Sequence, residues 1–237
     1  YNTEHFNLNA ALLQDIGPYY GYFPEPSKSI LIMPQDNLEA ASVAFKDHDF
    51  QITTGSRYLG GYIGEKDARD LWLQEKVIHW SEAVKELASA AGNFPQAAYA
   101  GLTKSVQQEW QFLQRVTEGI GDNFTDVQKA ITECFLPALF RDTLDGKDDV
   151  RLLLHGLPVK HAGMAIPDPT KSAKSNYEAS SLVTSHLFAA LTGNKAFRSQ
   201  EHVAVMADVK SEVKSRKQTT DDRTLKSILS KLPCDVS

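Results

Sequence analysis

The chain has 237 residues, 42% of them hydrophobic and 23% charged, which suits one large globular domain or two small ones. No apolar run approaches the roughly 18 residues that a membrane-spanning helix needs, and the first residues lack the basic and apolar regions of a secretory signal. The net charge of −5 counts against an autonomous nucleic-acid-binding domain, because phosphate neutralisation favours a basic protein.

The number and spacing of the cysteines indicate the redox environment of the protein. Cys134 and Cys234 are the two cysteines, and they form no Cys-x-x-Cys pair. Disulfides are rare where glutathione keeps thiols reduced, so we expect two free thiols in an intracellular protein, in the nucleus or the cytoplasm. No membrane partner is expected.

The first third of the chain mixes helix and strand signals. Apolar spacing predicts a short amphipathic helix over 3–16. The apolar run 29–33 predicts a buried strand, and Asp36 is expected to cap a brief helix after it. The stretch 50–64 is rich in β-branched and aromatic residues and interrupted by glycines, which predicts a hairpin or a pair of short strands.

Helical periodicity dominates from residue 65 onward. Apolar residues recur at three- and four-residue spacings in one long helix, at Leu73, Val77, Trp80, Val84, Leu87 and Ala91. A second helix is expected from Pro95 to near Gly119, and the short loop before it makes the two helices antiparallel neighbours. Thr125 is expected to open a third helix that runs through Leu139.

The last third is also predicted to be helical. Four helices are expected here, over 150–157, 177–191, 197–217 and 221–232. Ser175 or Asn176 is expected to cap the second of them, after a loop over 161–170 that contains glycine and proline.

These elements predict an α+β fold that is mostly helical. A small α/β segment over 1–64 is expected to end in a short hairpin. A helical domain over 65–193 and a charged helical tail over 194–237 are expected to follow.

Sequence motifs for catalysis are absent. The chain has no phosphate-binding glycine loop and no nucleophile elbow, and its seven histidines show no metal-ligand spacing. Two acidic pairs, Asp148-Asp149 and Asp221-Asp222, lack the flanking strand character of a polymerase magnesium site, so we interpret them as loop or helix-cap residues. No metal ligand is predicted.

Two segments carry a more specific signal. GPYYGYFPEPSKSILIM (Gly17 to Met33) and RYLGGYIG (Arg57 to Gly64) occur in this order. Together they resemble the stretch after the active-site turn in reverse transcriptases of retrotransposons. Ala97 to Arg115, Cys134 to Phe140 and Leu157 to Pro169 are similar to the region downstream in such proteins of eukaryotic mobile elements.

The resemblance implies an order of parts: the end of a palm, a primer-grip hairpin and a helical thumb. It implies that Lys28 lies near the incoming triphosphate as a possible general acid, although a solvated turn lysine beside prolines explains it equally. It places Tyr58, Leu59, Gly60 and Gly61 in the grip, where small residues let the primer backbone approach. A tight hairpin packed on the thumb is the alternative.

Three residues fall on the second thumb-like helix. Trp110 is expected in the core. Lys104 and Arg115 are candidates for contacts to phosphate, and the alternative for both is an exposed helix face.

The resemblance also implies what to expect outside the chain. The family's aspartate pair and its Mg²⁺ ions belong upstream of Gly17, where the chain offers only Asp15. We therefore expect a fragment that lacks fingers and most of the palm, binds no cofactor itself and is inactive alone. In the intact RNA-directed DNA polymerase it would help to hold the primer–template.

Two other hypotheses stay open. One is a non-enzymatic helical module that binds a protein partner, which the acidic balance favours over nucleic-acid binding. The other is an unrelated hydrolase or transferase, which would need a pocket with convergent ionisable groups.

Overall fold

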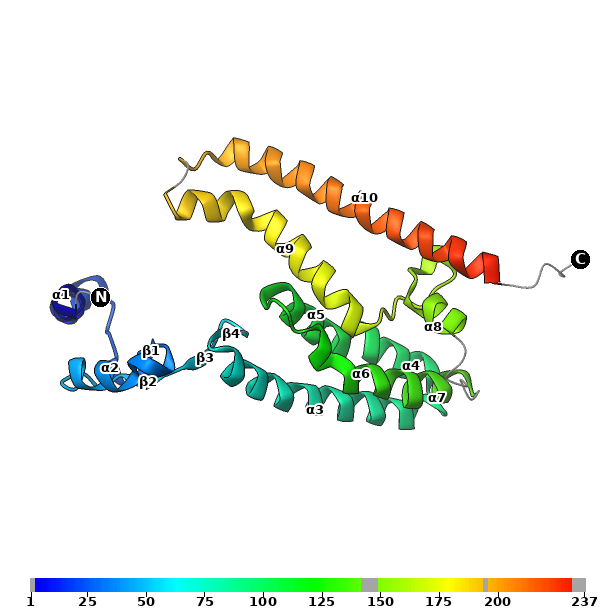
Figure 1. Cartoon of the computed structure of the whole chain (residues 1–237), viewed down its shortest axis with the longest axis horizontal. Helices are drawn as coiled ribbons and strands as arrows, with labels where there is room; N and C mark the ends of the chain where they lie inside the picture. The colour runs from blue at the N-terminus through cyan, green and yellow to red at the C-terminus, as the bar shows by residue number, and fades with distance from the viewer. Residues whose placement is uncertain (1–2, 142–148, 194–195, 232–237) are drawn as a thin grey trace, which may run out of the picture. The chain divides into compact units, whose positions relative to one another are not determined.

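The chain forms two compact units, residues 1–72 and 73–237, and the division falls inside helix α3 (Lys66–Ala91). The computed structural model describes residues 3–141, 149–193 and 196–231. Helices dominate, with two small two-stranded sheets near the amino-terminal end, so the predicted mostly helical α+β class is confirmed (Figure 1). The expected boundary after residue 64 comes just before α3.

The first unit begins with α1 (Thr3–Ile16), as the apolar spacing predicts. Its first sheet pairs β1 (Ile30–Ile32) with β2 (Gln51–Thr53) in parallel, so that Ile30 is opposite Gln51. Helix α2 (Leu38–Ala44) lies between them in the chain, which makes a short βαβ unit.

The prediction that Asp36 caps α2 is wrong. Asp36 lies in a 3₁₀ turn (Gln35–Asn37), and the residue before α2 is Asn37, which makes no side-chain cap bond. The side chain of Glu65 accepts a hydrogen bond from the backbone N–H of Gln35 at 2.7 Å. This long-range acceptor stabilises the turn where a local cap was expected.

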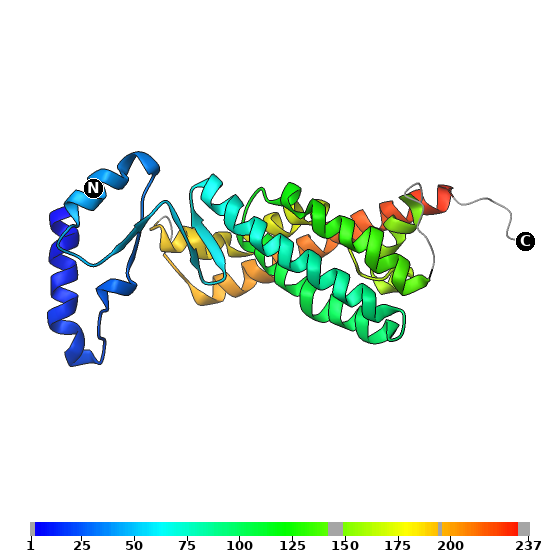
Figure 2. The same ribbon diagram turned by 90° about the horizontal axis from the view of Figure 1, so that it is seen from below.

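The second unit is built on an antiparallel helix pair, α3 and the helix that starts at Pro95 (Figure 2). The indole N–H of Trp80 donates to Glu109 Oε2 at 2.9 Å across this pair. Trp80 also packs edge-on against Trp110, with ring centroids 6.3 Å apart, and stacks on Phe124 at 6.0 Å. Trp110 is 1% exposed, so its predicted place in the core is confirmed.

Two of the predicted helices contain π-helical turns that periodicity did not indicate. The second helix consists of α4 (Pro95–Gly101), a π segment (Leu102–Val106) and α5 (Gln107–Val116). The third is likewise divided into α6 (Thr125–Lys129), a π segment (Ala130–Phe135) and α7 (Leu136–Phe140). A π turn shifts the helix face by a fraction of a turn, so the buried stripe continues at a new angle.

Helix α9 (Pro169–Leu191) begins earlier than predicted, because Asp168 caps it rather than Ser175 or Asn176. The Asp168 carboxylate accepts from the backbone N–H of Thr170 at 2.9 Å and from its hydroxyl at 2.6 Å. Proline follows the cap at the first helical position, where its missing N–H costs nothing. Asn176 lies within the helix and donates to Gln114 Oε1 at 2.8 Å.

The two final predicted helices are one, α10 (Ser199–Lys231), so Asp221 and Asp222 lie within a helix and do not cap one. No glycine or proline separates the predicted pieces. The hydroxyls of Thr219 and Thr220 donate to the carbonyls of Ser215 and Arg216, four residues earlier, so both side chains are hydrogen-bonded within the helix. α10 packs on α9 and on α8 (Asp149–Gly156).

The second helix also holds the loop before α9 in place. Two of its side chains donate to backbone carbonyls of that loop, Tyr99 to Met164 at 2.8 Å and Gln107 to Ala165 at 3.1 Å. Gln114 donates to the carbonyl of Pro169, the first residue of α9, at 2.9 Å. Gln114 is fully buried, and its other amide atom accepts from Ser172 and Asn176. The loop and helix segments singled out by the resemblance are thus packed on each other.

None of the described helices is both long and apolar enough to cross a lipid bilayer.

Candidate nucleic-acid interface

The grip-like segment forms a tight β-hairpin. Strands β3 (Gly55–Tyr58) and β4 (Gly61–Gly64) pair antiparallel, with Tyr58 opposite Gly61. The two-residue loop between them has φ values of 47° at Leu59 and 85° at Gly60. Positive φ at both positions is the mark of a type I′ turn, whose twist matches the strands that it joins. Glycine adopts this conformation freely, whereas leucine is strained in it.

The hairpin exposes apolar side chains rather than burying them. Tyr58 is 59% exposed, Leu59 80% and Ile63 50%. Tyr58 and Ile63 share one face of the hairpin, because side chains alternate along a strand and the register places Ser56 opposite Ile63. Ile63 was not among the predicted site residues, although strand alternation from Tyr58 could have indicated it.

The other face attaches the hairpin to the start of α3. The ring of Tyr62 packs against the indole of Trp72, with centroids 5.3 Å apart and a tilt of 31°. Aromatic pairs of this kind are worth about 0.5–1.5 kcal/mol beyond their buried area. The contact fixes the direction in which the turn at Leu59 points relative to the first turns of α3.

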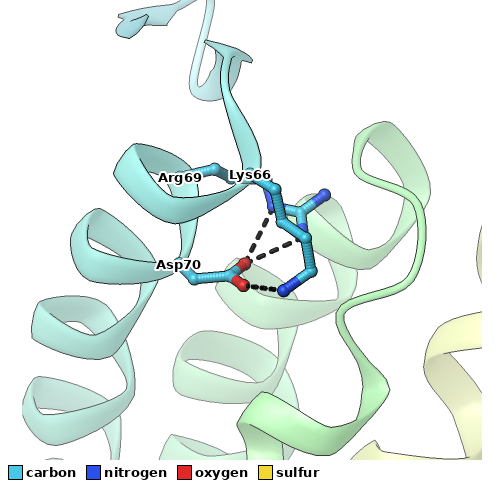
Figure 3. A network of polar contacts seen from close by, with 3 residues as sticks. All are labelled: Lys66, Arg69 and Asp70. Carbon is cyan, nitrogen blue, oxygen red and sulfur yellow. Dashed lines mark hydrogen bonds and ion pairs between the residues drawn. The ribbon is translucent and has the colours of Figure 1, made fainter. Parts of the chain in front are cut away.

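The first turn of α3 carries a polar network that sequence reasoning missed (Figure 3). The Asp70 carboxylate lies 2.6 Å from Lys66 Nζ, and it accepts from Arg69 Nη2 at 2.8 Å and from Arg69 Nε at 3.0 Å. The hydrogen bond from Lys66 lowers the pKa of Asp70 below its ordinary value of 3.8, and burial opposes this shift. The hydrogen bonds and the charge of Arg69 lower the pKa further. The spacing of Lys66 and Asp70, four apart on a helix, was the available signal.

This network predicts a pH-dependent contribution to stability. Because the folded pKa of Asp70 is depressed, its stabilisation is complete above pH 3.8 and is lost as the pH falls through the folded value. Asp70→Asn should lower the free energy of unfolding by about 0.5–1 kcal/mol at pH 7, as measured by urea denaturation. The difference from the wild type should shrink below about pH 4.

Asp67→Asn is the matched control, because Asp67 lies at the same helix end and belongs to no ion pair with Lys66 or Arg69. An equal loss of stability in both variants would attribute the effect to the helix dipole rather than to the network.

Lys28 lies in a 3₁₀ turn (Pro26–Lys28) just before β1. Its side chain is 77% exposed, and its ammonium is 2.6 Å from Glu25 Oε2, three residues earlier. The structure thus places it on the surface of the first unit beside an acidic neighbour. A role as general acid stays an expectation of the resemblance.

Lys104 and Arg115 lie on one continuous helix of the second unit. Lys104 is in the π segment and Arg115 in the last turn of α5, and both are exposed. The two residues are 11 positions apart, which at about 1.5 Å per residue is roughly 16 Å along the helix axis. The structure therefore groups the hairpin residues at one turn, and places these two cations separately on a helix.

Metal-binding side chains do not gather in the part of the chain that is described: no three His, Cys, Asp or Glu residues are arranged to hold an ion. Asp149 is the first residue of α8, whereas Asp148 and Cys234 lie outside the described residues. Cys134 is a free thiol.

No protein-family model, curated protein or solved structure matches this chain. The similarity to reverse transcriptases therefore depends on the sequence motifs alone, and what it implies for activity is a proposal.

Proposed function

We propose that this chain is the end-of-palm, grip and thumb part of a reverse-transcriptase-like protein, and that it helps to hold a primer–template duplex. One observation carries the proposal: the RYLGGYIG motif forms most of a hairpin with an exposed two-residue turn, and this hairpin leads directly into a long helix and a helical bundle. This is the order of parts that the resemblance implies. Alone, the chain would bind without polymerising.

The hairpin suits a nucleic-acid backbone in shape. Leu59 and Gly60 stand at its outer end, and the adjacent Tyr58 offers a half-exposed ring that can stack on a sugar or base. Lys66 and Arg69 follow in the first turn of α3, although Asp70 offsets part of their charge. Lys104 and Arg115 add exposed cations in the second unit.

The proposal is tested with a fluorescent RNA–DNA hybrid duplex, titrated with the full chain at about 50 and 200 mM salt. The wild type should bind at low salt and weaken as salt rises. Leu59→Asp should weaken binding roughly fivefold, because a carboxylate against a phosphate costs about 1 kcal/mol in water. Aspartate also tolerates positive φ better than leucine, so the turn should survive.

Val43→Asp is the charge-matched control, since Val43 is an exposed side chain on α2 in the same unit. It should bind like the wild type. Absence of wild-type binding at low salt would overturn the proposal. An equal loss of affinity in both variants would show that the hairpin does not contact the duplex.

A second candidate function is supported by a different surface. Large apolar side chains are exposed where α9 ends and α10 begins, at Leu187, Phe188, Leu191, Phe197 and Val203. Clustered exposed apolar residues mark sites of protein association. A chain that binds no duplex but forms a complex through these residues would be a helical protein-interaction module.

A further inference from the structure

The middle of α10 is a helical segment without packing. Each residue from Lys214 to Thr220 is exposed, about two helical turns, while α10 packs on α9 and on α8 elsewhere along its length. Figure 1 shows the helix running from its start beside the end of α9 to its last turns near α8. A helix that is polar on all sides gains nothing from the core, so this segment crosses solvent between the two packed ends of α10.

Lys217 lies on the side of α10 that packs at both ends. It follows Val213 by four residues and precedes Thr224 by seven, and both of those side chains are partly buried. Apolar periodicity would place a core residue at this position. The sequence has a lysine there, and the structure leaves it exposed.

This segment is basic within an acidic protein, with Asp208 before it and Asp221 and Asp222 after it. Between positions 210 and 217 there are three lysines and one arginine against a single acid, Glu212, in a chain with net charge −5. Arg216 forms an ion pair with Glu212. Lys210, Lys214 and Lys217 form no ion pair with any described residue, whereas Lys66, Lys129 and Lys171 each lie next to a carboxylate.

The three lysines share one helix face, because their spacing of four and three residues returns to nearly the same direction. They extend over about 10 Å of helix axis at 1.5 Å per residue. A nucleic-acid strand places a phosphate every 3.4 Å or so along a duplex axis, so this face can meet about three phosphates. Unpaired ammonium groups form such contacts without first breaking an ion pair.

We propose that the face of α10 formed by Lys210, Lys214 and Lys217 binds the phosphate backbone of a nucleic-acid duplex. The inference depends on the proposed duplex-holding function and adds a contact surface in the tail, outside the segments that carry the resemblance. The contact is electrostatic and independent of base sequence, so it would contribute affinity and salt dependence without specificity.

The test uses the full chain and the RNA–DNA hybrid, with affinity measured over a series of salt concentrations. Replacing all three lysines by glutamine should make the negative slope of log association constant against log salt shallower by about 3, roughly one per lost phosphate contact. The same positions changed to arginine should keep the wild-type slope, because the charge remains. Circular dichroism is used to check that the substitutions leave the helix content unchanged.

The charge-matched control replaces Lys46, Lys76 and Lys85 by glutamine, since these lysines lie on or next to other helices. Its slope should change by less than about 1. Equal changes in both triple variants, an unchanged slope in the α10 variant, or preferred binding of poly-glutamate would overturn this inference. Absence of wild-type binding would overturn the proposed function as well, so the two failures are distinguishable.

Discussion

Trp110→Ala should lower the free energy of unfolding of the second unit by about 3–5 kcal/mol. Trp110 is 1% exposed and touches Trp80, which in turn stacks on Phe124, so the truncation opens a cavity beside the ring of Trp80. Neighbouring rings are rigid and fill such a cavity poorly. Urea denaturation followed by circular dichroism at 222 nm, a wavelength for helix, measures the loss.

Phe112→Ala is the matched control, because Phe112 is on the same helix and 39% exposed. It should cost less than about 1.5 kcal/mol. Similar losses at both positions would show that helix propensity, rather than the aromatic cluster, determines the result.

Gly163→Ala should cost about 3 kcal/mol, at the upper end of the range for overpacking. A Cβ atom at this position would lie 2.0 Å from the carbonyl oxygen of Leu157 and 2.7 Å from that of Leu154. Both neighbours are backbone atoms, which cannot rotate away. The loop would have to move off the second helix and lose hydrogen bonds from Tyr99 and Gln107.

The control for this variant is Gly156→Ala in the same region. Its Cβ would meet nothing closer than 3.7 Å, and Gly156 is the last residue of α8. It should be neutral or up to about 1 kcal/mol more stable, through reduced freedom of the unfolded chain. A tolerated Gly163→Ala would contradict the close packing of the loop.

Sequence periodicity predicted the helices that bury a regular apolar stripe. α3 follows its predicted range closely, because apolar residues at three- and four-residue spacings specify both the helix and its buried face. α1 also has its predicted bounds, although its Leu12, Leu13 and Ile16 side chains are exposed. The type I′ hairpin was predictable as a hairpin, since Gly60-Gly61 lies within a β-branched and aromatic run. These features depend on neighbours in sequence.

Features that depend on distant partners could not be predicted. β2 pairs with β1 across α2, and Gln35 is held by Glu65, neither of which leaves a local pattern. The π turns give no periodic signal of their own. The start of α9 was different, because Asp168 before Pro169 is a recognisable cap signal that the prediction overlooked.

The candidate site was predicted only in part. Tyr58 and Leu59 were named from the motif and are exposed at the hairpin turn, as turn chemistry leads one to expect. Gly60 and Gly61 were also named, but Gly60 is half-buried and Gly61 is buried. The Asp70 network and the unpaired lysines of α10 depend on which charges find partners in the fold. Sequence shows the charges but not the pairs.

The hydrogen bonds from the second helix to the loop before α9 and to the start of α9 also bear on how the chain is made. Gln114 and Pro169 are 55 positions apart, and Tyr99 and Met164 are 65 apart. At ribosomal rates of about 5–20 residues per second, the Gln114 amide waits about 3–11 s for its acceptor to be synthesised. During that interval the side chain hydrogen-bonds to water, so this side of the helix must stay hydrated until the later half of the chain emerges and covers it.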